Sequence, residues 1–219
     1  MTLSGPITPE QSSQSAAEIC ALAPIVPVLV VEDVDHARPL ATALVEGRLP
    51  ALEVTLRTPA ALEVISEMSQ VVGGVVGAGT LLTPADVVAA VDAGAKFGVS
   101  PGATDRLLDA ALEAGLPMLP GAATATEVMA LLEKGYTVQK FFPAEASGGA
   151  PALKAIGAPI PQVKFCPTGG VSPKNAESYL SLSNVVCAGG SWVAPKDKMM
   201  SGDWADITAL AREASKLSR

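Results

Sequence analysis

Short apolar, β-branched segments alternate with longer amphipathic segments along most of the chain. The first apolar run covers residues 25–31 and precedes a helical pattern over residues 35–46. Gly47 follows this pattern and suits the left-handed position after a helix. Further strands are predicted at residues 52–56, 75–80, 96–100, 117–121, 137–142, 163–168 and 185–190. Between them, helices are predicted to begin at Thr58, Thr83, Thr104 and Thr124, because threonine is a favourable N-cap.

Eight strand–helix units in a chain of 219 residues predict a single α/β domain, residues 1–219, folded as a (β/α)8 TIM barrel. A doubly wound open sheet is the alternative, but it needs a glycine-rich turn after the first strand. Residues 32–35 read Glu-Asp-Val-Asp and offer no such turn. Residues 8–23 are expected to form an extra N-terminal helix, and residues 1–9 a mobile tail.

The charge and composition argue against nucleic acid, membranes and metal ions as binding partners. The formal net charge is −7 and there is no run of basic residues, so nucleic acid is not expected as a partner. No stretch of 18 apolar residues and no signal-peptide pattern is present, so we expect no membrane association. Three sparse cysteines indicate reduced thiols and a cytoplasmic protein. With His36 as the single histidine, and without CxxC spacing, no metal site is expected.

Polar side chains inside the predicted strands mark a candidate site. Side chains of a barrel strand alternate between the lumen and the surrounding helices. On the second strand, Glu53 and Arg57 share one parity, while the apolar Val54 has the other and can pack on helices. On the sixth strand, Lys140 lies among apolar residues and is predicted to point into the lumen at mid-height.

Lys140 is the strongest candidate for chemistry. An exposed edge lysine is the ordinary alternative, but a closed barrel has no edges. Burial disfavours a charged amine, and the neutral amine is the nucleophile that forms Schiff bases. Glu53 is either a salt partner or a proton-transfer group, and Arg57 is either a surface ion pair or a carboxylate ligand. Lys164 lies early in its strand, at the opposite end, where a structural ion pair is expected.

Paired glycines follow the seventh and eighth predicted strands. They are Gly169-Gly170 and Gly189-Gly190, with the hydroxyls of Thr168 and Ser191 beside them. Turns alone could require such glycines. In barrels, however, the loops after strands seven and eight often bind phosphate through backbone N–H groups. Two such pairs at corresponding loops therefore predict a phosphate site.

Six sequence blocks, in order, resemble the 2-keto-3-deoxy-6-phosphogluconate (KDPG) aldolase family. They are LEVTLRT at residues 52–58, GAGT at 77–80, SPG at 100–102, KFFPAE at 140–145, FCPTGG at 165–170 and GGSW at 189–192. The similarity extends from about Ala23 to the last predicted helix. It implies a class I aldolase that needs no metal or cofactor and assembles as a homotrimer.

The resemblance also implies roles for individual residues. Lys140 would form the Schiff base and Glu53 would transfer protons. Arg57 and Thr80 would hold the substrate carboxylate, and Pro101 and Phe142 would line the pocket. The phosphate would lie against Thr168, Gly169, Gly170, Gly190 and Ser191.

The implied substrate is a phosphorylated keto acid, cleaved to pyruvate and D-glyceraldehyde 3-phosphate. Many members of the family also cleave 4-hydroxy-2-oxoglutarate to pyruvate and glyoxylate. Three alternatives stay open: an aldolase for the galactonate-derived epimer, a phosphosugar isomerase or epimerase, and a non-catalytic barrel that binds a phosphosugar or pyridoxal phosphate.

Overall fold

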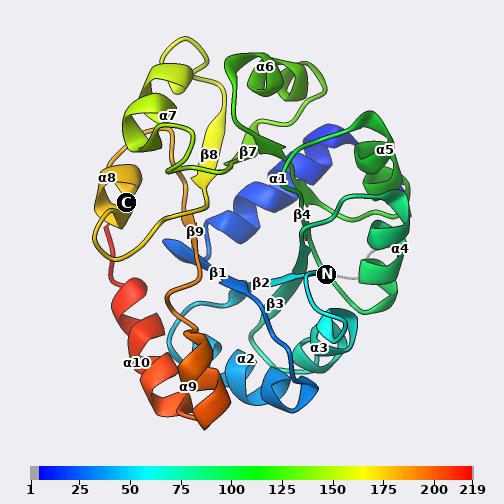
Figure 1. Ribbon diagram of the computed structural model, residues 1–219. Coiled ribbons are helices and arrows are strands. Elements are labelled where there is room, and N and C mark those ends of the chain that lie inside the picture. Colours follow the sequence, from blue (N-terminus) through cyan, green and yellow to red (C-terminus); the bar gives the residue numbers. More distant parts are fainter. Residues whose placement is uncertain (1–4, 219) are drawn as a thin grey trace.

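The computed structural model describes residues 5–218. Strands and helices alternate along this part of the chain, as the sequence pattern predicted (Figure 1). In order, the elements are α1 Pro9–Cys20, β1 Ile25–Leu29, the 3-10 helix η1 Val34–His36, α2 Ala37–Glu46, β2 Ala51–Thr55, α3 Ala61–Met68, β3 Val75–Gly79, α4 Pro84–Asp92, β4 Gly98–Val99, α5 Asp105–Glu113, β5 Met118–Leu119, β6 Gly121–Ala122, α6 Ala125–Glu133, β7 Val138–Phe141, α7 Gly149–Gly157, β8 Lys164–Pro167, α8 Ala176–Leu180, β9 Ala188–Gly190, α9 Lys196–Ser201 and α10 Trp204–Ala214.

All strand pairs between these elements are parallel. One sheet has the order β5-β4-β3-β2-β1-β9 and the other has the order β6-β7-β8. The strand predicted at residues 117–121 is observed as β5 and β6, which are separated by Pro120, a residue without an N–H to donate. Isolated parallel bridges join Phe165 to Val185 and Thr168 to Gly189, at the side of the second sheet that faces β9. The fold is therefore an α/β fold of curled parallel sheets with helices outside them (Figure 1).

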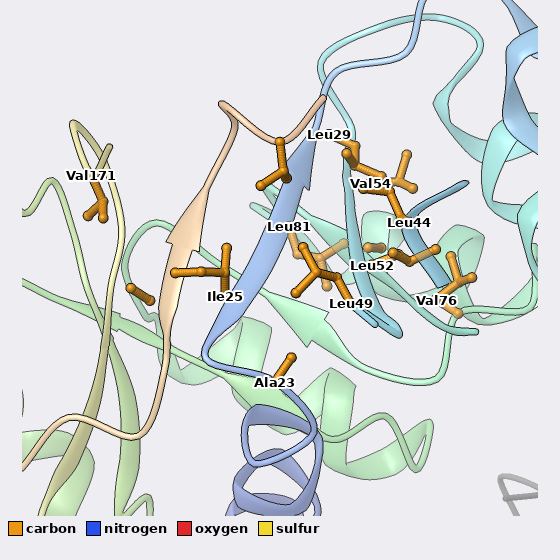
Figure 2. Close-up of a cluster of buried hydrophobic side chains, with 14 of the residues drawn as sticks. Ala23, Ile25, Leu29, Leu44, Leu49, Leu52, Val54, Val76, Leu81 and Val171 are labelled. Carbon is orange, nitrogen blue, oxygen red and sulfur yellow. The ribbon is translucent and has the colours of Figure 1, made fainter. Parts of the chain in front are cut away.

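Alternate strand residues enter two separate hydrophobic clusters. The larger cluster lies between the strands and the helices and includes Leu52 and Val54 of β2 and Leu44 of α2 (Figure 2). The smaller cluster lies on the other face of the strands and contains Cys20, Val26, Ala51, Phe97, Val99, Leu119, Val138, Cys166 and Cys187. All three cysteines are buried and free. The predicted parity of the second strand is also confirmed, because Val54 packs toward the helices and Ala51 away from them.

Helix α1 covers the beginnings of β5 and β7. Thr8 caps the helix in a capping box with Gln11. The buried hydroxyl of Ser12 accepts a hydrogen bond from the amide of Met118 at 2.9 Å. The hydroxyl of Ser13 accepts from the amides of Thr137 at 2.9 Å and Val138 at 3.1 Å. These serines satisfy strand N–H groups that would otherwise be buried without a partner.

The segment that was expected to be a mobile tail, residues 1–9, lies partly outside the described residues. Residues 1–4 are not described. The amide of Ile7 donates to the carbonyl of Leu112 at 3.0 Å, and the amide of Thr8 donates to the side chain of Gln11 at 2.9 Å. Residues 7 and 8 are thus bonded to the body of the protein and to α1.

The predicted helix starts are confirmed at Thr83, Thr104 and Thr124, each of which caps the helix that follows it. The start predicted at Thr58 is wrong, because α3 begins at Ala61. The Thr58 hydroxyl donates to the carbonyl of Val31 at 2.6 Å, and the N-cap position of α3 is Ala60, which has no side-chain cap hydrogen bond. Helix α9 was not predicted.

The left-handed conformation predicted for Gly47 is wrong. Its φ is −76°, and the neighbouring Arg48 has the positive φ of 69°. Glycine is needed at position 47 for a different reason: a Cβ there would lie 2.3 Å from the Cβ of Ala211. The close approach of α2 and α10 therefore depends on Gly47.

This close approach leads to a testable prediction for stability. Gly47→Ala should lower the free energy of unfolding by about 1–3 kcal/mol, because the helices must separate to admit the methyl group. Gly102→Ala is the matched control, since a Cβ at Gly102 would have nothing within 4 Å. Urea denaturation of both variants measures the difference. Equal free energies of unfolding would contradict the packing argument.

Candidate active site

Lys140 and Glu53 meet in the interior of the strand assembly. Lys140 lies on β7 and Glu53 on β2, and Lys140 Nζ is 3.2 Å from Glu53 Oε1. Their side chains are only 6% and 3% exposed, respectively. Lys140 shares parity with Val138, whose side chain lies in the smaller cluster, so both point away from the outer helices. A buried ion pair contributes little net stability, because desolvation of both charges offsets their attraction. The pair is therefore a candidate for chemistry.

The surroundings of the pair leave little free space. A Cβ on Gly79 of β3 would lie 2.4 Å from Glu53 Oε1, so only glycine fits opposite the carboxylate. The ring of Phe142 lies beside the amine, with its centroid 5.1 Å from Lys140 Nζ. The same ring also approaches Gly169, where a Cβ would lie 3.3 Å from Phe142 Cδ2. Phe142 thus connects the amine to the first glycine loop.

Arg57 and Thr80 lie together just beyond the ends of β2 and β3. Arg57 Nε donates to Thr80 Oγ1 at 3.3 Å. Thr80 has a φ of 64°, a conformation that is strongly disfavoured for a β-branched residue. Strained backbone of this kind clusters at ligand-binding sites. The exposed guanidinium and the half-buried hydroxyl can both donate to an anionic group.

Pro101 follows β4, and its backbone packs against Gly121 of β6. A Cβ on Gly121 would lie 2.3 Å from the Pro101 carbonyl oxygen. Gly121 is in turn the register partner of Lys140. Pro101 is therefore two strands away from the amine, at the same level of the sheets.

The two glycine loops are adjacent. Gly169 and Gly170 have φ values of 99° and 81°, so both need glycine. Thr168 bridges to Gly189, and a Cβ on Gly189 would lie 2.3 Å from Thr168 Oγ1. A Cβ on Gly190 would instead lie 1.9 Å from the Trp192 ring, so indole packing also requires this glycine. Ser191, between Gly190 and Trp192 in the sequence, is exposed.

Lys164 and His36 both lie outside the site. Lys164 was expected in an ion pair, but its Nζ donates to the carbonyl oxygen of Ser183 at 2.9 Å. His36 is half-buried, and its ring makes an edge contact with Trp204, with centroids 5.5 Å apart. Neither residue contacts the Lys140–Glu53 pair.

No group of three or more His, Cys, Asp or Glu side chains within residues 5–218 is arranged to hold a metal ion. None of the helices described there is long and apolar enough to cross a membrane.

The buried Lys140 amine, with Glu53 beside it to exchange protons, can form a Schiff base with a carbonyl group, and this chemistry defines the class I aldolases. Such an enzyme is a carbon–carbon lyase that works through a lysine Schiff base. The chain belongs to the KDPG and KHG aldolase family, whose sequence model matches residues 16–210.

Individual relatives agree with this assignment over nearly their full lengths. The 2-dehydro-3-deoxy-phosphogluconate aldolase of Pseudoalteromonas atlantica is 51% identical over 201 residues, which are 91% of this chain and 94% of the relative. The KDPG aldolase of Zymomonas mobilis ZM4, solved with 3-phosphoglycerate, is 49% identical, with a TM-score of 0.91 over 94% of this chain and 98% of that one. The Legionella pneumophila KDPG aldolase, solved with pyruvate as a covalent carbinolamine, is 45% identical, with a TM-score of 0.88 over 91% and 98% of the two chains.

Proposed function

We propose that the protein cleaves 2-dehydro-3-deoxy-6-phosphogluconate (KDPG) to pyruvate and D-glyceraldehyde 3-phosphate. The observation that carries the proposal is the buried contact between Lys140 and Glu53. The names of the relatives support the substrate, and the carbinolamine of the Legionella pneumophila enzyme supports the covalent chemistry. The name of the matching family also includes KHG, which supports a second activity on 4-hydroxy-2-oxoglutarate.

In this proposal, Glu53 first accepts a proton from the Lys140 ammonium, which is within hydrogen-bonding distance. The neutral amine attacks the C2 carbonyl and forms a carbinolamine. Glu53 returns a proton to the hydroxyl, water leaves, and a protonated imine remains.

Cleavage then uses the imine as an electron sink. Glu53, through a water molecule, takes the proton of the C4 hydroxyl while the C3–C4 bond breaks. The bonding electrons form the enamine of pyruvate, and glyceraldehyde 3-phosphate leaves. Protonation at C3 and hydrolysis of the imine release pyruvate and restore Lys140.

The remaining residues position the two ends of the substrate. Arg57 and Thr80 hold the carboxylate, and their mutual hydrogen bond supports this shared role. Pro101 and Phe142 line the pocket between the ends. The phosphate binds at Thr168, Gly169, Gly170, Gly190 and Ser191, a placement supported by the adjacency of the two loops.

Ser191→Ala tests the phosphate placement. The variant should raise KM for the phosphorylated substrate by about 3- to 10-fold, the effect of losing one ordinary hydrogen bond. KM for 4-hydroxy-2-oxoglutarate, which has no phosphate, should change much less. Initial rates with both substrates provide the measurement, and equal changes would argue against the contact.

A coupled assay for pyruvate release tests the proposed function directly. The substrates are KDPG, its galactonate-derived C4 epimer and 4-hydroxy-2-oxoglutarate. The highest kcat/KM is expected for KDPG. Preference for the epimer would identify the alternative aldolase. Binding of phosphosugars without release of pyruvate from any substrate would indicate a non-catalytic barrel.

Three further features belong to the proposal. The strands close into a (β/α)8 barrel with α1 as an extra N-terminal helix, which the bridges between β8 and the chain at β9 support. The enzyme is a homotrimer, as resemblance to the family suggests, and sedimentation would measure this. The three free cysteines support a cytoplasmic enzyme.

A further inference from the structure

We infer that Glu145, Asn175 and Tyr179 are positioning residues, which hold the Gly169-Gly170 loop in the conformation that receives the substrate phosphate. The inference rests on the proposed function, because it takes a phosphorylated substrate as given. None of the three was a candidate from the sequence, and they come from the segment before α7 and from α8 and its N-cap.

The carbonyl groups of the loop accept hydrogen bonds from residues outside it. The Thr168 carbonyl accepts from the amide of Ala144 at 2.8 Å, and the Gly169 carbonyl accepts from the amide of Glu145 at 3.0 Å. The Gly170 carbonyl accepts from Asn175 Nδ2 at 3.1 Å. Three consecutive carbonyl groups are therefore fixed by residues outside the loop.

The amide groups of the loop, unlike its carbonyl groups, are not all occupied by hydrogen bonds within the protein. Within residues 5–218, no hydrogen-bond acceptor is found for the consecutive amides of Gly170 and Val171. Consecutive free amides next to fixed carbonyl groups form an anion-binding concavity. The loop thus has its acceptors occupied and its donors available.

Asn175 fixes the far end of the loop as well as its middle. Its Oδ1 accepts from the amide of Ser172 at 2.7 Å and from the Ser172 hydroxyl at 3.2 Å. Together with its bond to the Gly170 carbonyl, one side chain spans residues 170–172. Movement of Asn175 would therefore release both ends of this span.

Glu145 adds a packing contact and raises an electrostatic problem. Its side chain lies directly against Gly170, where a Cβ would be 2.6 Å from Glu145 Cγ. A free carboxylate so close to the loop would repel a phosphate. The hydroxyl of Tyr179 donates to Glu145 Oε1 and fixes the orientation of the carboxylate.

Tyr179 suits this role because it is a permanent donor. Its side chain is fully buried in α8. Burial, together with the hydrogen bond to the Glu145 carboxylate, raises the pKa of the Tyr179 hydroxyl. The hydroxyl therefore keeps its proton across the working pH range and continues to hold Glu145.

The test compares binding of the phosphate with binding of pyruvate, which does not reach the loop. For Tyr179→Phe and Asn175→Ala, KM for KDPG and Ki for inorganic phosphate should each rise by about 2- to 10-fold, the effect of one lost hydrogen bond. The pyruvate concentration that half-saturates borohydride trapping on Lys140 should change by less than about 2-fold. Glu145→Gln keeps an oxygen that accepts from Tyr179, and should therefore bind phosphate more tightly than Glu145→Ala.

Tyr136→Phe is the matched control, since Tyr136 is also buried but precedes β7 at the α1 end of the strands. Its phosphate and pyruvate constants should equal those of the wild type. Parallel weakening of phosphate and pyruvate binding in the Tyr179 and Asn175 variants would overturn the inference, as would unchanged phosphate binding in both. If Tyr179→Phe does not fold, the phosphate and pyruvate constants of Asn175→Ala test the inference alone. Failure of the wild type to cleave KDPG would instead refute the proposed function.

Discussion

Lys140→Ala is expected to abolish cleavage of KDPG, with a loss of kcat on the order of 10⁶-fold, as when other covalent nucleophiles are removed. Among residues 5–218, Lys140 is the one lysine that forms an ion pair with Glu53. Lys140→Arg should be equally inactive, because it restores a positive charge next to Glu53 but cannot form an imine. The measurement is release of pyruvate under saturating substrate.

Borohydride trapping separates loss of the nucleophile from loss of the fold. Reduction in the presence of pyruvate should add one pyruvate-derived group to Lys140 in the wild type and none in either variant. Lys164→Ala is the matched control, because Lys164 is also on a strand but its ammonium donates to the Ser183 carbonyl, away from Glu53. Full activity of Lys140→Ala, or an adduct on another lysine, would refute the mechanism.

Glu53→Gln has the second largest expected effect. If Glu53 transfers the protons of dehydration and cleavage, kcat should fall by about two to four decades. The amide is nearly isosteric, so it can fit beside Gly79, but it cannot accept the proton of the Lys140 ammonium. The decrease should appear in single-turnover cleavage as well as in the steady state. A near-normal rate would remove Glu53 from the mechanism.

Loss of the charge at Glu53 also leaves the Lys140 amine buried without a counter-charge, which costs stability. Thermal denaturation therefore accompanies the kinetic measurement, to show that the variant is folded at the assay temperature. Glu67→Gln is the control for removing a carboxylate from an ion pair. Its partner is Arg38 on the surface, at 2.5 Å, where the pair contributes little. Its kcat should equal that of the wild type.

Much of the fold could be predicted from local sequence patterns. Alternation of apolar runs and helical patterns predicted the element order, and three threonine caps were located correctly, because caps depend on residues close in sequence. The wrong predictions concern residues whose conformation is determined by tertiary contacts. Thr58 bonds to Val31 rather than capping a helix, and Gly47 is required by Ala211 of a helix far along the chain.

The centre of the site was predictable for a similar reason. Strand parity alone brings Lys140 and Glu53 toward one interior, and their ion pair agrees with that prediction. The positive φ of Thr80 had no signal in the sequence, because threonine rarely adopts it. Asn175 and Tyr179 were also missed. Their contacts join segments about 5 to 34 residues apart, and no spacing rule relates them.

The serines of α1 have a consequence for the order of events during synthesis. Ser12 bonds to Met118 and Ser13 to Val138, separations of 106 and 125 residues along the chain. Formation of such distant contacts requires closure of a long loop and is correspondingly slow. Helix α1 therefore cannot make both contacts until the chain has been synthesised past Val138. We therefore expect docking of α1 to follow formation of the strand pairs that are closer together in the sequence.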